Sequence, residues 1–221
     1  MTDFEELQVG DQRARAYVRV PDGARAGILV LHAWWGLNED VLAYADRLAD
    51  AGFAVLAPDM FEGAVATEIE DAEKLVATGD ERAEGIVLAA VDALGERLGP
   101  EAPLGVLGFS FGAAYAILAP SERGRLSAAV VYYGSYYGDF LAKSKAPLLG
   151  HFAEDDDFEP DENILALEDG LRTAGREVTI HRYPGTGHWF AEPSRDAYRA
   201  EAAELAFERT VAFLRGQLRP A

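Results

Sequence analysis

The sequence predicts a doubly wound α/β fold, in which a mostly parallel sheet carries helices on both faces. Short and almost uninterrupted apolar runs recur along the 221 residues, as expected of strands that are covered on both faces. Segments with the apolar spacing of helices separate these runs, which is the strand and helix alternation of such folds. No repeat and no linker rich in Ser, Gly or Pro divides the chain, so a single domain over residues 1–221 is expected.

The first elements are expected to form a hairpin or another strand pair. Residues 15–20 alternate polar and apolar side chains, which is typical of a half-exposed strand. Pro21, Asp22 and Gly23 follow this segment, and they favour a turn because proline and glycine suit the φ angles that turns require.

Five apolar runs are expected to form the central parallel strands. They lie at residues 27–31, 53–57, 104–107, 128–132 and 146–149. The alternating residues 178–183 predict a further strand. Ligands of such sheets bind beyond the carboxyl ends of the strands, so the residues that directly follow each strand are the first candidates for a site.

Two helices can be placed by their ends and by their apolar spacing. Asn38 can cap a helix with Glu39 and Asp40 in its first turn, and Gly52 is expected to end it. The last helix is expected from about Asp196 onward. Its apolar side chains recur at steps of four, four, three and four residues and form one stripe that can pack on the sheet: Ala203, Phe207, Val211, Leu214 and Leu218.

The composition excludes several classes of function. The chain has 38 acidic and 20 basic side chains, and its net charge of -18 disfavours nucleic acids and anionic membranes as partners. The absence of Cys excludes disulfides, thiolate-bound metals and a cysteine nucleophile. No apolar run reaches the roughly 18 residues of a membrane span, and residues 1–6 are acidic where a secretory signal would be basic. We therefore expect a cytoplasmic protein.

The segment that follows the strand at residues 104–107 has the pattern of a nucleophile elbow. It reads Gly108-Phe109-Ser110-Phe111-Gly112, and small residues of a helical segment come next. The tight turn from strand to helix strains the central residue and exposes its oxygen, and glycines must flank it because side chains there would clash. Ser110 is the candidate nucleophile. An ordinary tight turn is the alternative.

A serine nucleophile needs a histidine base and a carboxylate that orients this base. His188 lies in a glycine-rich loop directly after the strand at residues 178–183, where the backbone can direct its imidazole over the sheet. His181 lies within that strand, His151 ends an apolar strand, and both are expected to be structural. His32 is expected to support the loop after the strand at residues 27–31.

The acid is expected among the carboxylates of residues 154–159, which follow the strand at residues 146–149. Such a run is also common as a helix cap, and it could bind a divalent cation. Its spacing differs from that of an EF-hand loop, so neither a metal nor a cofactor is expected.

The tetrahedral intermediate of acyl transfer needs two backbone N–H donors. The candidates are the amide of Phe111, directly after the serine, and the amide of Trp34, after the strand at residues 27–31. Aromatic residues near these loops indicate an apolar pocket for a neutral acyl or aryl group, with ordinary core packing as the alternative. The pocket candidates are Trp35, Phe109 and Trp189.

Five segments, in this order and over nearly the whole chain, carry a family resemblance: residues 31–38, 57–61, 108–112, the acidic loop that ends at Pro160, and residues 187–191. In these segments the sequence resembles the dienelactone hydrolase family of α/β-hydrolases. The resemblance implies the α/β-hydrolase fold, and the short segment between residues 120 and 144 leaves little room for a large lid. The family's acid stands four residues before a proline, which selects Asp156, with Asp155 or Asp157 as alternatives.

Three departures from the family pattern bear on function. The family's type enzyme has a cysteine nucleophile where this chain has Ser110, and a glutamate in the early loop where this chain has Ala33. The type enzyme also binds its anionic substrate with arginines, and one of these corresponds to Glu192. With Glu192 and the acids of residues 154–159 on the two site loops, neutral esters are expected to be better substrates than anionic ones.

The sequence therefore predicts a serine hydrolase of small carboxylic esters or lactones, with Ser110, His188 and Asp156 as its triad and an acyl-enzyme intermediate. The expected partner is a small neutral ester or lactone. Two alternatives remain: a binding module that keeps the fold without catalysis, and the same triad used for acyl transfer or for hydrolysis of carbon–carbon bonds.

Overall fold

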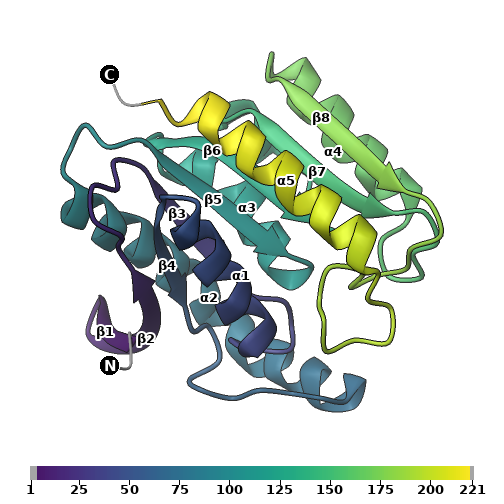
Figure 1. The fold of residues 1–221 in the computed structure, drawn as a ribbon, viewed down its shortest axis with the longest axis horizontal. Coiled ribbons are helices and arrows are strands. Elements are labelled where there is room, and N and C mark those ends of the chain that lie inside the picture. Colours follow the sequence, from purple (N-terminus) through teal and green to yellow (C-terminus); the bar gives the residue numbers. More distant parts are fainter. Residues whose placement is uncertain (1–3, 220–221) are drawn as a thin grey trace.

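The computed structural model describes residues 4–219, except for the side chains of residues 80 and 81. Residues 1–3, where the acidic start begins, lie outside this range. In chain order the strands are β1 (Phe4–Val9), β2 (Gln12–Arg19), β3 (Gly27–Leu31), β4 (Ala54–Pro58), β5 (Leu104–Phe109), β6 (Leu126–Tyr132), β7 (Leu148–Ala153) and β8 (Val178–Tyr183). They form one sheet in the order β1-β2-β4-β3-β5-β6-β7-β8 (Figure 1).

The sheet is parallel from β4 to β8, and β2 is antiparallel to both β1 and β4. The predicted opening hairpin is present, but its turn lies at Gly10, between β1 and β2, and not at residues 21–23. The turn after β2 closes with a 3.1 Å hydrogen bond from the amide of Ala24 to the carbonyl of Pro21. It leads the chain past the neighbouring β4 and into β3.

Helices cover both faces of the sheet, as a doubly wound fold requires. The helices are α1 (Glu39–Asp50), α2 (Ile69–Leu98), α3 (Phe111–Glu122), α4 (Asp161–Thr173) and α5 (Ala200–Gln217), with a short 3-10 helix over Asp139–Lys143. Helices α1 and α5 lie on the face that is toward the viewer in Figure 1, and α2, α3 and α4 lie behind the sheet.

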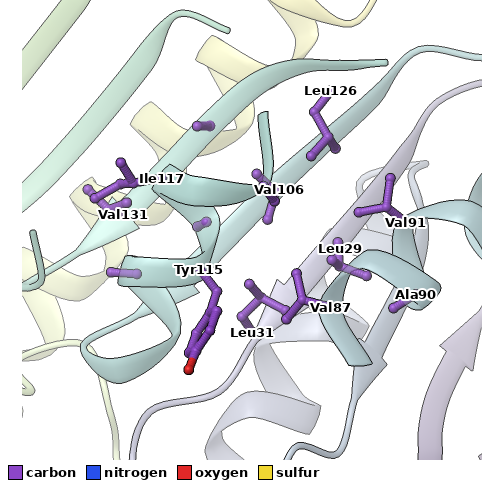
Figure 2. Packing of buried hydrophobic residues seen from close by; sticks show 14 of the residues in the cluster. Leu29, Leu31, Val87, Ala90, Val91, Val106, Tyr115, Ile117, Leu126 and Val131 are labelled. Carbon is purple, nitrogen blue, oxygen red and sulfur yellow. The ribbon is translucent and has the colours of Figure 1, made fainter. Parts of the chain in front are cut away.

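The two cores follow from the alternation of side chains along each strand. On β3, Ile28 and Val30 pack toward α1 and α5, whereas Leu29 and Leu31 pack toward α2 and α3. Figure 2 shows this second core, where residues of α2 and α3 meet those of β3, β5 and β6. All four β3 side chains are fully buried, which explains why the strand reads as a continuous apolar run.

The ends of α1 agree with the prediction, and the start of α5 differs from it. The side chain of Asn38 accepts a 3.2 Å hydrogen bond from the amide of Val41 and caps α1, and Gly52 follows the helix with φ 98°. Helix α5 begins at Ala200, because residues 192–199 form successive hydrogen-bonded turns. Of its predicted stripe, Phe207 is half-buried and the other members are buried.

The connection from β6 to β7 decides whether the described fold carries a large lid. Only the 3-10 helix and its flanking loops lie between β6 and β7, so the fold has no large lid. Within residues 4–219, none of the helices combines the length and the apolar character of a membrane span.

Candidate active site

Ser110 stands in the turn between β5 and α3 with φ 46° and ψ −109°, angles that a residue with a side chain rarely adopts. The flanking glycines make this turn possible. A Cβ atom on Gly108 would lie 2.2 Å from the carbonyl oxygen of Gly112, and a Cβ atom on Gly112 would lie 2.6 Å from that of His32. The turn has the geometry of a nucleophile elbow and presents the Ser110 side chain at the end of the sheet.

Ser110, His188 and Asp156 form one line of hydrogen bonds. The Ser110 hydroxyl lies 2.9 Å from Nε2 of His188, and Nδ1 of His188 lies 2.8 Å from each carboxylate oxygen of Asp156. Because a carboxylate accepts hydrogen bonds, Nδ1 carries the proton and Nε2 accepts from the serine. The side chains of His188 and Asp156 are only 5% and 3% exposed, so the hydrogen bonds between these two residues are shielded from water.

The acid is held by its own loop. Oδ1 of Asp156 accepts hydrogen bonds from the amides of Phe158 and Glu159, at 2.9 and 3.0 Å. Asp155 and Asp157, the alternatives for the acid, are exposed. Asp156 is therefore the carboxylate that the structure brings to the histidine.

The acid loop after β7 and the histidine loop after β8 are fastened to each other. The amide of Asp155 donates to the carbonyl of Thr186 at 3.0 Å, and the amide of Gly185 donates to the Glu154 carboxylate at 2.9 Å. The acidic run therefore serves to join loops and to orient the histidine. Within residues 4–219, no group of three or more His, Asp and Glu side chains could hold a metal ion.

The other three histidines have structural surroundings. His32 is buried, its Nδ1 donates to the carbonyl of Ala33 at 2.7 Å, and its Nε2 accepts from the amide of Met60 at 3.0 Å. Burial lowers the pKa of His32 to about 4, so the ring is neutral when it supports this loop. His151 is buried between the hydroxyls of Tyr183 and Thr210, and its ring stacks on that of His181.

The two candidate oxyanion donors lie beside Ser110. Phe111 is the first residue of α3, so its amide belongs to the positive end of that helix. Trp34 lies in the loop after β3, and both residues line the same cavity as Ser110. In the part of the chain that the structure describes, neither amide donates to a backbone or side-chain acceptor. Both are therefore available to a bound oxygen.

A cavity of about 630 Å³ opens above Ser110 and His188. Its other lining residues are Trp34, Val76, Glu84, Phe111, Ala114, Tyr115, Leu118, Tyr133, Gly134, Ser135, Tyr136, Phe158 and Glu159. This volume is typical of sites for small molecules. The lining is mostly apolar and aromatic, with polar groups near the serine, and none of its described members is Lys or Arg.

The three aromatic residues predicted for the pocket do not line this cavity. Phe109 points to the opposite face of the sheet, where its ring lies 5.0 Å from that of Tyr44. Trp35 is 2% exposed and packs edge-on against Trp189, with the rings 5.2 Å apart. Trp189 stacks on Trp34 at 5.9 Å. Trp35 and Trp189 therefore support the wall residue Trp34 from behind.

Several lining residues were missed by sequence reasoning. Ala114, Tyr115 and Leu118 follow Phe111 at helical spacing on α3, so the helical segment after the elbow carried a usable signal. Val76 and Glu84 come from α2, a helix that sequence reasoning did not place.

Glu192 was expected to repel anionic substrates, and the structure corrects this expectation. The side chain is buried outside the cavity lining, and its Oε1 accepts a 2.8 Å hydrogen bond from the hydroxyl of Tyr133. Burial raises the pKa of Glu192 to about 8, so the group is mostly uncharged at neutral pH. Glu154, Asp155 and Asp157 also lie outside the lining, and among the predicted loop acids only Glu159 contributes to it.

The chain matches known proteins over almost its full length. It is 30% identical over 230 residues to Protein usf of Aquifex pyrophilus, covering 99% of this chain and 98% of that protein. It is 29% identical over 238 residues to the "Probable 2-oxo-3-(5-oxofuran-2-ylidene)propanoate lactonase" of Bradyrhizobium sp., covering 98% and 94%.

A solved structure shows the same fold. The crystal structure of a dienelactone hydrolase-like promiscuous phosphotriesterase from metagenomic libraries superimposes with a TM-score of 0.84 at 23% identity, over 98% of each chain. The model of the dienelactone hydrolase family matches residues 14–218. The chain is therefore a hydrolase that belongs to the dienelactone hydrolase family and has the α/β-hydrolase fold.

Proposed function

We propose that this protein is a serine hydrolase of small carboxylic esters or lactones. The observation that carries the proposal is the line of hydrogen bonds from Ser110 through His188 to Asp156, at the floor of an open cavity. The lactonase name of the Bradyrhizobium relative is consistent with a lactone or ester bond as the target.

The geometry supports a two-step reaction. Oγ of Ser110 attacks the substrate carbonyl carbon while its proton passes to Nε2 of His188. The amides of Trp34 and Phe111 stabilise the negative oxygen that forms. The carbon–oxygen bond to the alcohol then breaks, the alcohol takes the proton from His188, and an acyl group remains on Ser110. A water molecule, activated by His188 in the same way, releases the acid.

Asp156 has a positioning role in this scheme. Both of its oxygens lie 2.8 Å from Nδ1 of His188, which keeps the proton on that nitrogen and stabilises the imidazolium that forms during attack. Two backbone amides hold the carboxylate, so it cannot turn away from the ring without losing these bonds.

The cavity size and the absence of a large lid favour soluble substrates with small groups. The cavity of about 630 Å³ accommodates a short acyl or aryl ester, and its described lining residues offer no Lys or Arg for a carboxylate. We infer that neutral esters are better substrates than anionic ones, as the sequence predicted. The carboxylates that would repel an anionic ester are Glu84 and Glu159 in the cavity lining, and not the buried Glu192.

The acyl-enzyme step can be tested by rapid mixing with short p-nitrophenyl esters, and simple lactones can be tested for turnover beside them. The expected result is a burst of nitrophenol that approaches one equivalent of enzyme, followed by slower turnover. His188→Ala should lower turnover on the order of 10⁴-fold. Full activity of His188→Ala, or of Ser110→Ala, would refute the proposed mechanism. Absence of hydrolysis combined with ligand-induced thermal stabilisation would favour the binding module.

A further inference from the structure

The cavity beside Ser110 combines aromatic rings with negative charge. Among the residues whose side chains the structure describes, the lining includes six aromatic side chains and two acidic ones, Glu84 and Glu159. The rings belong to Trp34, Phe111, Tyr115, Tyr133, Tyr136 and Phe158. Aromatic faces attract cations through their π-electrons, and indole does so most strongly. The lining therefore offers two kinds of interaction that favour the same sign of charge.

Glu159 is built into the wall of the cavity. Glu159 is 8% exposed, and its carboxylate accepts hydrogen bonds from the amide and the hydroxyl of Ser135, at 2.8 and 2.7 Å. Glu84 is exposed on α2 and lies at the rim. In the described part of the chain, neither carboxylate forms an ion pair with Lys or Arg. Their charge is therefore not neutralised locally.

The charge of the whole protein acts in the same direction. With a net charge of -18, the chain attracts cations and repels anions at low salt. A partly enclosed cavity with low-dielectric walls strengthens this effect, because fewer water molecules screen the charges inside it.

We propose that the substrates of this site are esters that carry an ammonium group, which binds against the aromatic wall between Glu84 and Glu159 while the carbonyl carbon meets Ser110. This inference rests on the proposed esterase function and goes beyond it by naming the charge of the substrate. Rings and carboxylates together hold the ammonium group, and a carboxylate in the same place would meet two like charges and no Lys or Arg.

Matched ester pairs test the proposal. The first pair is acetylcholine and its uncharged tert-butyl isostere, which differ only in the charge of the alcohol part. The second pair is the ethyl ester of a trimethylammonium alkanoate and its tert-butyl isostere, which differ only in the charge of the acyl part. In buffer of low ionic strength, kcat/KM should be at least about tenfold higher for the cation in one of these pairs, and added salt should reduce this ratio. Ratios of one or less in both pairs would overturn the proposal.

Substitution of the wall acid identifies the source of the preference. Glu159→Gln should lower the ratio at least about threefold, and Glu84→Gln should lower it less, because its charge is more exposed to water. Glu162→Gln removes the same charge from the exposed first turn of α4 and should leave the ratio unchanged. A ratio that is insensitive to both Glu159→Gln and Glu84→Gln would contradict the proposed binding site.

A binding measurement separates this inference from the proposed function. Choline and its uncharged tert-butyl isostere, which contain no ester bond, can be titrated into the wild-type protein by calorimetry. Choline should bind at least about tenfold more tightly, and Glu159→Gln should weaken its binding at least threefold. If neither member of any ester pair were hydrolysed, the esterase proposal would fail, and this titration would still decide the preference for a cation. Equal affinities for choline and its tert-butyl isostere would refute the proposed preference for a cation.

Discussion

The hydroxyl of Tyr133 donates a 2.8 Å hydrogen bond to Glu192, and both side chains are buried beside the candidate base. The ring of Tyr133 lies 5.0 Å from that of His188, and Tyr133 itself holds a positive φ of 37°. The second oxygen of Glu192 is buried without a hydrogen-bond partner in the described residues. A charged carboxylate is costly in such a place, so the proton on Glu192 stabilises the fold.

Glu192→Gln should therefore change the pH dependence of stability. The pKa of Glu192 is about 8 in the folded protein against an ordinary value of 4.5. Between these values the folded state holds a proton that the unfolded state has lost, so stability falls as pH rises. At pH 9 the free energy of unfolding of Glu192→Gln should exceed that of the wild type by about 4 kcal/mol. Near pH 5 the difference should be much smaller.

Denaturant unfolding at several pH values measures this difference. Glu73→Gln, on the exposed side of α2, is the matched control and should show no such trend. A difference between Glu192→Gln and the wild type that stayed constant from pH 5 to pH 9 would mean that Glu192 is charged throughout this range.

Asp156→Asn should lower kcat on the order of 10³- to 10⁴-fold toward a short ester, with the fold intact. The amide cannot keep the proton on Nδ1 of His188 as the carboxylate does. Asp155→Asn and Asp157→Asn remove neighbouring exposed charges and should change kcat only a few-fold. Steady-state kinetics and circular dichroism of the three variants provide the test. Equal losses in all three would argue against a specific role for Asp156.

Gly112→Ala should destabilise the protein by about 2–3 kcal/mol. The added methyl group would lie 2.6 Å from the backbone oxygens of Leu31 and His32. Leu31 is the last residue of the central strand β3 and His32 follows it, so neither oxygen can move away freely. Gly216→Ala adds the same group near the end of α5, where nothing lies within 4 Å. Alanine favours helices, so this control should be neutral or stabilising. Thermal unfolding of both variants measures the effect. A melting temperature of Gly112→Ala equal to that of Gly216→Ala would contradict the prediction.

A carboxylate on the substrate should reduce turnover. An ester that ends in a carboxylate is expected to have a lower kcat/KM than its methyl-capped counterpart in 10 mM buffer, where the Debye length is about 30 Å. The difference should narrow in 0.5 M salt, because screening weakens the repulsion from Glu84 and Glu159. Better turnover of the anionic ester at low salt would contradict the substrate charge inferred for this cavity.

Local patterns predicted the strands and the helix caps well. The apolar run at residues 27–31 coincides with β3, and Asn38 caps α1 as its side chain and position indicate. These features depend on neighbouring residues, which the sequence displays directly. The late start of α5 depends on turns between Trp189 and Arg199 that carry no apolar periodicity, and the spacing, which begins at Ala203, did not mark the first residue of the helix.

The site was predictable where the fold topology supplied the geometry. Residues that follow parallel strands meet at one sheet edge, so Ser110 and His188 could be paired although 78 positions separate them. The pocket was less predictable. Phe109 faces away from the cavity because of its position in the alternation along β5, and Val76 and Glu84 reach it from α2. Such placements depend on packing between elements that are distant in sequence.

The most direct test of the central claim is covalent labelling of Ser110 with a fluorophosphonate. Intact mass spectrometry should show one label on the wild-type protein, and peptide mapping should place it on Ser110. Ser110→Ala should take up no label and should lose hydrolysis of short p-nitrophenyl esters. Undiminished labelling or hydrolysis by Ser110→Ala would contradict the assignment of Ser110 as the nucleophile.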